Sequence, residues 1–202
     1  VNLTAFETFF PEQRPFFIEG NQLLQGSGPG YYYSRRIGAT PQGYATGEVA
    51  DSADFLESPR YATILGAAKL TGRTSSGMSI GALAAVTQRE YANLYDMTTN
   101  SFDKVAVEPS TAYLVGRVQQ EFGASASTVG VTLTGLSRNF SDAEPLKQQM
   151  TSQAVSGGAD WLLRMNNGQF LVGGHAGFSY IHGSDTAVTA VQTSSAHYYQ
   201  RP

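Results

Sequence analysis

The chain of 202 residues contains no cysteine, which excludes a disulfide framework, a cysteine-ligated metal and a cysteine nucleophile. Charged residues are scarce, at 14% of the chain against roughly 25% in ordinary soluble domains. The net charge is only −3 and no basic run occurs, so we expect no nucleic-acid partner. The longest mostly apolar stretch, Ile80–Val86, is far shorter than the roughly 20 residues of a membrane helix. If the chain meets a membrane core, it must do so as strands.

The chain is instead rich in glycine, with 22 residues, and in tyrosine and phenylalanine, with 11 each. Residues 1–30, which we call the lead, are rich in phenylalanine. Thr4 can cap a short helix with Glu7 at the capping-box position, and Pro11 is expected to end that helix. We expect the lead to dock onto something larger through its five phenylalanines, Phe6, Phe9, Phe10, Phe16 and Phe17.

The body of the chain alternates with a period of two, which predicts half-buried strands. Within 64–73, one face carries Ile64, Gly66, Ala68 and Leu70, and the other carries Lys69, Thr71 and Arg73. Within 112–122, Leu114, Gly116, Val118 and Phe122 oppose Tyr113, Arg117, Gln119 and Glu121. Within 128–136, Val129, Val131 and Leu133 oppose Thr128, Thr132 and Thr134. The alternation predicts eight strands, at 30–37, 61–72, 78–91, 111–122, 128–138, 154–166, 169–182 and 193–201.

Short and long connections between these strands alternate. The short ones lie at 73–77, 123–127 and 166–168, and the last contains Asn-Gly, a strong hairpin signal. The long ones lie near 38–60, 93–110, 139–153 and 183–192. Outer-membrane barrels alternate tight periplasmic turns with long outer loops, and strands of ten or more residues suit a tilted membrane strand. The rival interpretation is a soluble antiparallel barrel or sandwich, whose strands are usually shorter.

Four blocks of the sequence are distinctive: residues 2–20, residues 32–38 (YYSRRIG), residues 64–73 (ILGAAKLTGR) and residues 194–202 (SSAHYYQRP). Together they resemble a bacterial family of unknown function, DUF5916. Family members are long secreted proteins of Gram-negative bacteria. Their N-terminal part is similar to a family 9 carbohydrate-binding sandwich, and their C-terminal part looks like an outer-membrane barrel. The resemblance therefore implies a bacterial outer-membrane location, with outer-membrane lipid as a partner and carbohydrate bound only through an upstream domain. Members are sometimes labelled membrane-associated hydrolases, without catalytic residues that could be mapped here.

Charged residues of the lead and of the next segment form the first set of candidate site residues. Arg14 and Glu19 flank the Pro15–Phe17 turn, and Arg35 and Arg36 begin the first predicted strand. With Glu7 and Glu12, they can form ion pairs that hold the lead inside a barrel. The alternative is that the three arginines bind an anionic solute, since guanidinium groups suit bidentate recognition. Structural pairing is the favoured interpretation.

A second set of charged residues recurs on the predicted polar strand faces, namely Lys69, Arg73, Arg89, Arg117 and Arg164. In a pore, such a basic stripe would favour anion passage. Glu90, Glu121 and Asp160 are near enough in register to neutralise the stripe. We therefore favour a ladder of salt bridges over an anion path.

Histidine, serine and aspartate on the last long strands give the only catalytic candidates. Ser179 and His175 share one strand face, and with Asp160 they could form a hydrolytic triad, although no motif around them supports it. His175 and His182 lie seven residues apart and face opposite sides of a regular strand, and His197 lies further on. The sequence thus predicts no metal site, and the absence of phosphate-binding glycine spacings predicts no cofactor.

The sequence as a whole predicts an all-β, antiparallel meander of about eight long strands, part of an outer-membrane-type barrel. The lead, residues 1–30, is expected to pack in the lumen or at the barrel mouth, and residues 31–202 to form strands of a larger barrel. Tyrosines near the strand ends would form the interfacial girdles: Tyr31, Tyr32, Tyr33, Tyr91, Tyr95, Tyr180, Tyr198 and Tyr199. The favoured role is structural or transport-related, against a membrane-associated hydrolase or a soluble β-barrel binding module.

Overall fold

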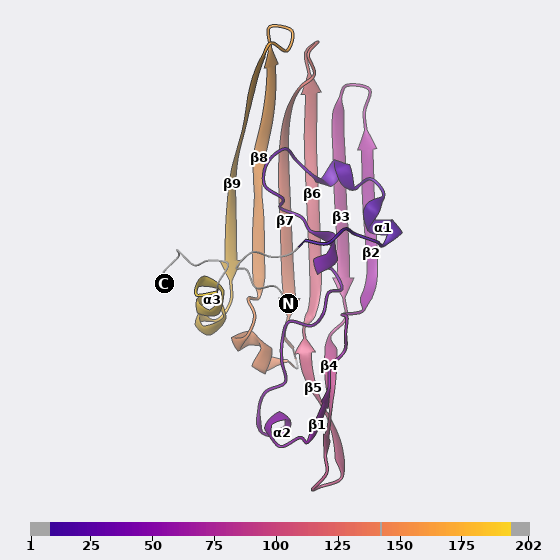
Figure 1. The fold of residues 1–202 in the computed structure, drawn as a ribbon, viewed down its shortest axis with the longest axis vertical. Helices are drawn as coiled ribbons and strands as arrows, with labels where there is room; N and C mark the ends of the chain where they lie inside the picture. Colours follow the sequence, from indigo (N-terminus) through magenta and orange to yellow (C-terminus); the bar gives the residue numbers. More distant parts are fainter. Residues whose placement is uncertain (1–8, 142, 195–202) are drawn as a thin grey trace.

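The computed structural model describes residues 9–141 and 143–194 and shows an all-β, antiparallel architecture (Figure 1). Within these ranges, nine strands form two sheets, one of six strands and one of three. The helices are short, and none of those in the described ranges has the length and apolarity that a membrane-crossing helix requires. The antiparallel all-β fold predicted from the alternation is therefore confirmed.

The larger sheet, called the main sheet, is an antiparallel meander in the order β2-β3-β6-β7-β8-β9. Its strands are ten to thirteen residues long, and they are β2 (Ile64–Arg73), β3 (Met78–Thr87), β6 (Ser110–Phe122), β7 (Ser127–Asn139), β8 (Gln153–Met165) and β9 (Phe170–His182). Six of the eight predicted strands correspond to these elements. Within the described residues, β2 and β9 form the two edges of this sheet.

Short turns join the main-sheet strands at one end, and long connections join them at the other, as predicted (Figure 1). The turn between β8 and β9 has left-handed backbone at Asn166, Asn167 and Gly168, the conformation that Asn and Gly adopt most readily. The long connection between β7 and β8 contains the 3-10 helix η3 (Glu144–Gln148). The alternation of connection lengths is therefore a property of the fold.

The predicted loop at 93–110 is wrong, because a hairpin forms there. Its strands β4 (Glu90–Asp96) and β5 (Ser101–Glu108) pair with each other, and β4 also pairs with the short strand β1 (Phe55–Glu57). This small sheet projects beyond the long-connection end of the main sheet (Figure 1). The predicted strand 78–91 accordingly divides at residues 88–89 into β3 and β4.

The predicted first strand, 30–37, is also wrong. The segment instead contains the 3-10 helix η2 (Ser34–Arg36), because its polar groups bond to residues about 23 positions earlier and not to a neighbouring strand. The chain before it forms α1 (Pro15–Ile18) and the 3-10 helix η1 (Asn21–Leu24), and α2 (Glu48–Asp51) follows. The helix predicted from Thr4 lies outside the described residues.

The last predicted strand, 193–201, lies largely outside the described residues, and a helix, α3 (Asp185–Gln192), precedes it. Ser184 caps this helix, since its side-chain oxygen accepts a hydrogen bond from the Ala187 amide at 3.2 Å. The Ser184 hydroxyl also donates to the Lys147 carbonyl at 2.6 Å. These bonds hold α3 against η3 at the long-connection end of the sheet.

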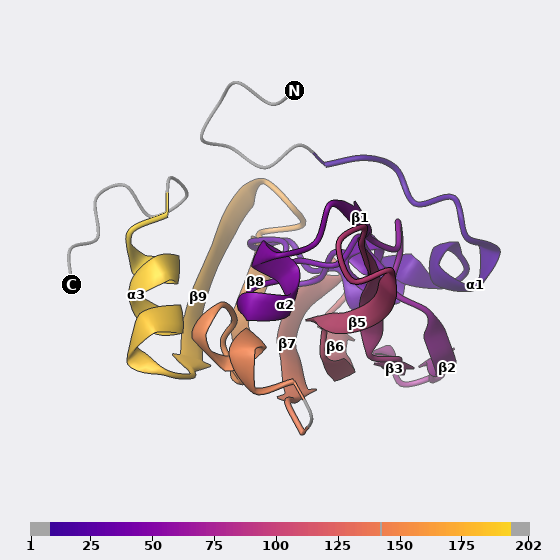
Figure 2. The same cartoon turned by 90° about the horizontal axis from the view of Figure 1, so that it is seen from below.

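Residues 9–38, which we call the covering segment, lie against one face of the main sheet (Figures 1 and 2). A core cluster forms between them, with Phe17, Leu24 and Ile37 from the covering segment and Leu83, Ala85 and Val115 from β3 and β6. All six side chains are at most 4% exposed. This is the core that fixes the covering segment on the sheet, and we call the covered side the inner face and the opposite side the outer face.

Candidate functional site

Strand register places the predicted polar positions together on the inner face. Lys69 pairs with Leu83, Arg117 with Gly81 and Thr132, and Asp160 with Gly130. The same registers bring seven charged residues to this face, namely Lys69, Arg73, Arg117, Glu121, Arg138, Asp160 and Arg164. The period-two interpretation is thus confirmed across five strand pairs.

One placement within that pattern is wrong. The alternation predicts Ile64 on the face of Gly66, but a register shift between Ile64 and Gly66 moves it to the inner face. There it packs against the core cluster of the covering segment. Sequence alternation alone carries no signal for such a bulge.

The outer face carries large apolar side chains that stand exposed. In the main-sheet strands as described, no outer-face position holds Asp, Glu, Lys or Arg. The large outer-face residues that are more than 40% exposed are Leu70, Val86, Leu114, Val118, Phe122, Val129, Val131, Leu133, Met165, Phe170, Val172, Phe178 and Tyr180. A continuous apolar surface of this extent marks a contact with a partner or with lipid.

A buried ion pair occupies the centre of the inner face. The Arg117 guanidinium donates to the two carboxylate oxygens of Asp160 at 2.6 and 3.0 Å, and both side chains are less than a tenth exposed. The guanidinium also donates to Thr132 Oγ1 at 2.7 Å and to Gln119 Oε1 at 2.8 Å. The bidentate geometry and the extra acceptors satisfy the buried charges.

The covering segment closes over this pair through Ser27. The Ser27 hydroxyl donates to Asp160 Oδ2 at 2.9 Å, and its amide lies within 3.3 Å of the same oxygen. Ser27, which lies 133 positions before Asp160 in the chain, therefore adds its hydrogen bonds to those that Arg117 donates to the Asp160 carboxylate. Sequence reasoning missed this contact, because Ser27 lies in a glycine-rich loop without regular periodicity.

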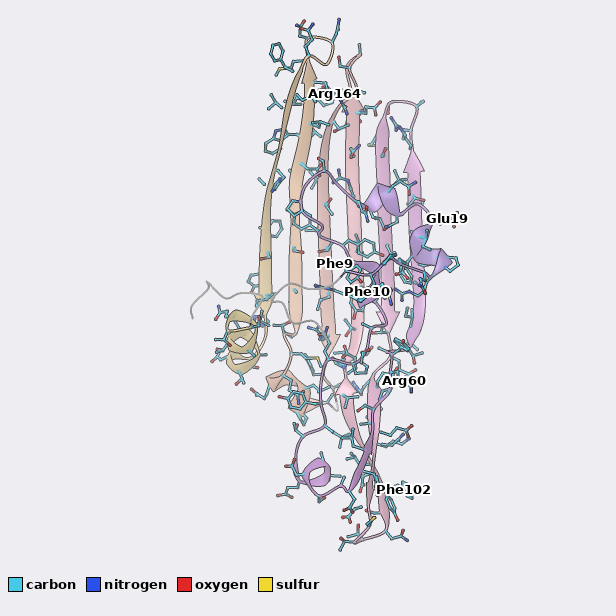
Figure 3. The ribbon with its side chains drawn as sticks, viewed as in Figure 1. Phe9, Phe10, Glu19, Arg60, Phe102 and Arg164 are labelled. Carbon is cyan, nitrogen blue, oxygen red and sulfur yellow. The ribbon has the colours of Figure 1, made fainter. Side chains whose placement is uncertain are left out.

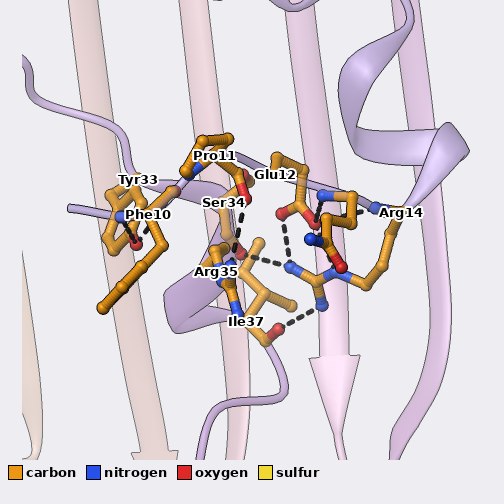
Figure 4. A network of polar contacts seen from close by, with 9 residues as sticks. Phe10, Pro11, Glu12, Arg14, Tyr33, Ser34, Arg35 and Ile37 are labelled. Atoms are coloured by element: carbon orange, nitrogen blue, oxygen red, sulfur yellow. Dashed lines mark hydrogen bonds and ion pairs between the residues drawn. The ribbon is translucent and has the colours of Figure 1, made fainter.

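Arg14 forms a second polar centre, shown in Figure 4. Its guanidinium pairs with the Glu12 carboxylate at 2.7 Å and donates to the carbonyls of Ile37 at 2.6 Å and Ser34 at 2.9 Å. Its cationic carbon also lies 4.2 Å from the centre of the Phe17 ring. The Arg14 hydrogen bonds lower the pKa of Glu12 to about 2. In this structure, the Arg14 guanidinium is thus engaged by groups of the protein, as the interpretation of a structural ion pair expects.

The neighbouring candidates have varied surroundings. The Arg35 side chain donates to the Pro11 carbonyl at 3.0 Å and lies 5.7 Å from the Phe10 ring centre (Figure 4). The Tyr33 hydroxyl accepts from the Phe10 amide at 2.9 Å. Arg36 is exposed and lines a hollow beside the covering segment. Neither Arg35 nor Arg36 begins a strand, because both lie in η2.

Lys69 fastens α1 to the edge strand β2. Its ammonium group donates to the carbonyls of Phe16 and Glu19 and lies 4.9 Å from the Phe16 ring centre. A cation at the carboxyl end of a helix is also favoured by the helix dipole. Glu19 thus contributes a backbone carbonyl here, and its side chain is exposed at the margin of the sheet (Figure 3).

The remaining basic candidates lie toward the ends of the strands. Arg73 pairs with Glu121 at 2.8 Å near the short-turn end. Arg164, visible in Figure 3 near that end, donates to the Ala126 carbonyl. Arg89 lies between β3 and β4, and it donates to Ser141 at 3.1 Å. Salt bridges to acidic side chains therefore account for Arg73 and Arg117, and backbone or hydroxyl acceptors serve the others.

The three catalytic candidates share the inner face but do not form a hydrogen-bonded triad. His175 lies directly opposite Asp160, and Ser179 lies opposite Ser156, four residues or about 13 Å further along β9. The Asp160 carboxylate is engaged by Arg117 and Ser27. His182 faces the opposite side of the strand from His175, as predicted, and His197 lies outside the described residues. Within the described ranges, no group of three or more His, Asp or Glu side chains could hold a metal ion.

The tyrosines predicted to form girdles are distributed differently. Tyr31, Tyr32 and Tyr33 lie in the covering segment, Tyr91 and Tyr95 lie in the small sheet, and Tyr180 lies on the outer face. Tyr198 and Tyr199 lie outside the described residues. Of the six described tyrosines, five thus stand away from the main-sheet strands and do not form the two predicted girdles at the ends of those strands.

A polar contact that sequence reasoning missed holds the chain just beyond the covering segment. The Gln42 amide donates to a carboxylate oxygen of Glu108 at 2.8 Å, at the long-connection end of the sheet. Glu108 is 5% exposed, and burial raises the pKa of its carboxyl group. In the sequence, Glu108 is only an acidic residue at the end of an alternating stretch. Nothing in that pattern distinguishes it from a surface glutamate.

Of the hollows beside the covering segment, two adjoin each other over β8 and β9. One of about 540 Å³ is bounded by residues 31–33 and by Thr134, Ser156 and Ser179. The other, of about 440 Å³, is bounded by Pro29, Tyr31 and His175. Volumes of this order accommodate small solutes.

Comparison with known proteins identifies a family and no nearer relative. No curated protein matches the chain, and no solved structure matches it. Residues 1–197 match the model of one family, described as a domain of unknown function, and the chain therefore belongs to the DUF5916 family.

Proposed function

We propose that the main sheet is part of the wall of an outer-membrane β-barrel, with the covering segment inside the lumen, in a structural or transport-related role. The observation that carries the proposal is the outer face, where exposed side chains such as Val131 and Leu133 are apolar and no charged residue occurs among the described positions. Membrane barrels require this arrangement, because their lipid-facing positions alternate with polar lumenal ones.

The length of the apolar band supports the same proposal. On β9 the outer-face residues from Phe170 to Tyr180 span about 34 Å along the strand. A strand tilt of about 40° reduces this to about 26 Å along the membrane normal, close to the roughly 25 Å of barrel apolar bands. The outer-face ends are polar but uncharged, with Gln120 toward the short turns and Gln153 and Ser137 toward the long connections.

The alternation of turns and loops supports an orientation. In bacterial barrels the short turns face the periplasm and the longer loops face outward. The turns after β2, β6 and β8 would then be periplasmic, and the small sheet would lie outside the cell. In this arrangement the free edges of β2 and β9 pair with further strands that close the barrel, because an open edge is not tolerated in lipid.

The sole tryptophan of the chain offers a direct test. Trp161 lies on the outer face of β8, over Gly174, where a Cβ atom would stand 2.4 Å from the indole ring. The full-length protein would be reconstituted into vesicles, with any additional tryptophan replaced by phenylalanine, and Trp161 fluorescence measured. We expect quenching by lipids brominated in the acyl chains and protection from aqueous iodide. Quenching by iodide alone would show that the outer face meets water or a soluble partner, and would overturn the proposal.

A further inference from the structure

The two hollows beside the covering segment are neighbours that share three lining residues, Tyr31, Ser156 and Ser179. The smaller lies over β8 and β9, and the larger extends from these strands over β6 and β7 and is bounded also by α3, with the covering segment on their other side. The covering segment therefore does not fill the space over these two strands. The hollows are arranged end to end along the strands, with the Tyr31 side chain between them.

Tyr31 is held at this point by a notch in the sheet. Gly158 and Gly177 pair across β8 and β9, and a Cβ atom at either position would lie 2.4 or 1.9 Å from the Tyr31 hydroxyl oxygen. Any side chain on these two residues would displace the tyrosine. The pair of glycines thus provides the seat for a bulky ring at the junction of the two hollows.

The two hollows are lined by apolar side chains interrupted by a row of hydroxyl groups, and they are almost uncharged. Thr134 and Ser156 share a hydrogen bond of 2.8 Å between their hydroxyl groups, and Ser179 continues this row across β9. Arg36 at one end and His175 at the other are the only Lys, Arg, His, Asp or Glu residues that line either hollow, within the described part of the chain. An ion would lose hydration there without a row of countercharges, whereas a neutral polar solute can exchange water for hydroxyl groups.

We propose that these hollows form a passage for small uncharged, hydrogen-bonding solutes along β8 and β9, with Tyr31 as its constriction. The inference rests on the proposed membrane-spanning role and adds to it a route and a class of solute. It predicts that a bulky side chain on the passage wall slows permeation, and that removal of the Tyr31 ring accelerates it.

The test uses the full-length protein in vesicles and measures osmotic swelling with glucose, gluconate and protonated glucosamine. Ser179→Phe narrows the wall, and Ala176→Phe, which places the same ring on the outer face of the same strand, is the matched control. Tyr31→Ala removes the constriction. We expect glucose to enter faster than either ion, Ser179→Phe to slow glucose at least tenfold, Tyr31→Ala to accelerate it several-fold, and Ala176→Phe to leave it unchanged.

Trp161 quenching, measured on the same vesicles, separates the two proposals. If acyl-chain bromines quench Trp161 in every variant but neither Ser179→Phe nor Tyr31→Ala changes glucose entry, the passage is disproved while the membrane role stands. Faster entry of gluconate or glucosamine than of glucose would overturn the solute class. Failure of the bromine quenching would remove both proposals.

Discussion

Along β7, Val131 and Leu133 on the outer face are 56% and 47% exposed, whereas Thr132 between them on the inner face is 3% exposed. In a water-soluble sheet the order is reversed, with the aliphatic residues buried and the threonine outside. The inner face buries hydroxyl groups and an ion pair beneath the covering segment, and the outer face leaves its aliphatic side chains bare. The contrast teaches that residue type on this strand does not follow burial within this chain. Under the proposed membrane role, it follows the medium that each face meets.

The two faces also differ in how they gain specificity. The inner face uses directed contacts, such as the bidentate Arg117–Asp160 pair and the Ser27 bond that closes over it. The outer face has no comparable directed contacts, since its side chains are apolar and project from alternate positions. The effects of substitutions on the inner face should therefore depend on particular partners. Under the proposed membrane role, those on the outer face should depend on depth in the membrane.

The largest expected effect is the loss of one partner from the inner-face ion pair. Arg117→Ala leaves the Asp160 carboxylate buried without its countercharge, and we expect the free energy of unfolding to fall by about 3–5 kcal/mol. Denaturant titration of the vesicle-reconstituted protein measures the change. Arg73→Ala is the control, because its pair with Glu121 is solvent-exposed and should contribute less than about 1 kcal/mol. Equal losses for the two variants would contradict the distinction between the buried and the exposed pair.

The next effect tests whether the cost of a charge on the outer face depends on its depth in a bilayer. Leu133→Arg places a charge at the middle of β7 and should lower the unfolding free energy in lipid by about 2–4 kcal/mol. Ser137→Arg, on the same face near the long-connection end, should cost no more than about 1 kcal/mol. The same titration in vesicles gives both values. An equal loss of unfolding free energy for the two variants would show that this face does not span the depth of a bilayer.

The strand pattern could be predicted from the sequence because it is local. Leu114 and Val118 alternate with Tyr113 and Arg117, and that order alone assigns each residue to the face on which it is found. The tight turn at Asn167 was likewise readable from its own residues. Both signals arise within a few positions, where backbone geometry relates side chains directly.

The covering segment was not predictable in detail because its contacts are distant in sequence. The Arg14 side chain donates hydrogen bonds to the carbonyls of Ser34 and Ile37. These bonds favour the helix η2 at a place where the sequence predicts a strand. The bond from Ser27 to Asp160 spans 133 positions. No local period records such partners, so the site that they form could be found only from the fold.

A smaller effect concerns the pH dependence of stability that arises from the Glu12–Arg14 ion pair at the start of the covering segment. The pKa of Glu12 is lowered to about 2 in the fold from its usual 4.5, so its stabilisation is present above pH 4.5 and is lost as the pH falls toward 2. Allowing for the partly exposed Arg14, we expect a loss of about 2 kcal/mol. Glu12→Gln should remove this pH dependence when unfolding free energies are measured from pH 7 to pH 2. A variant with the wild-type slope would mean that other groups produce it.

The smallest effect compares two glycines on neighbouring strands, one on each face. At Gly81 on the inner face, an added Cβ atom would stand 2.6 Å from the Leu23 carbonyl oxygen of the covering segment, whereas at Gly116 on the outer face no atom of the described residues lies within 4 Å. Gly81→Ala should therefore lower the unfolding free energy by about 1 kcal/mol, because the backbone of η1 must shift. Gly116→Ala should be neutral or stabilising by about 0.5 kcal/mol, since alanine restricts the unfolded chain. Denaturant titrations measure both changes in unfolding free energy. Equal changes would contradict the close packing of the covering segment on the inner face, which the core of Phe17, Leu24 and Ile37 requires.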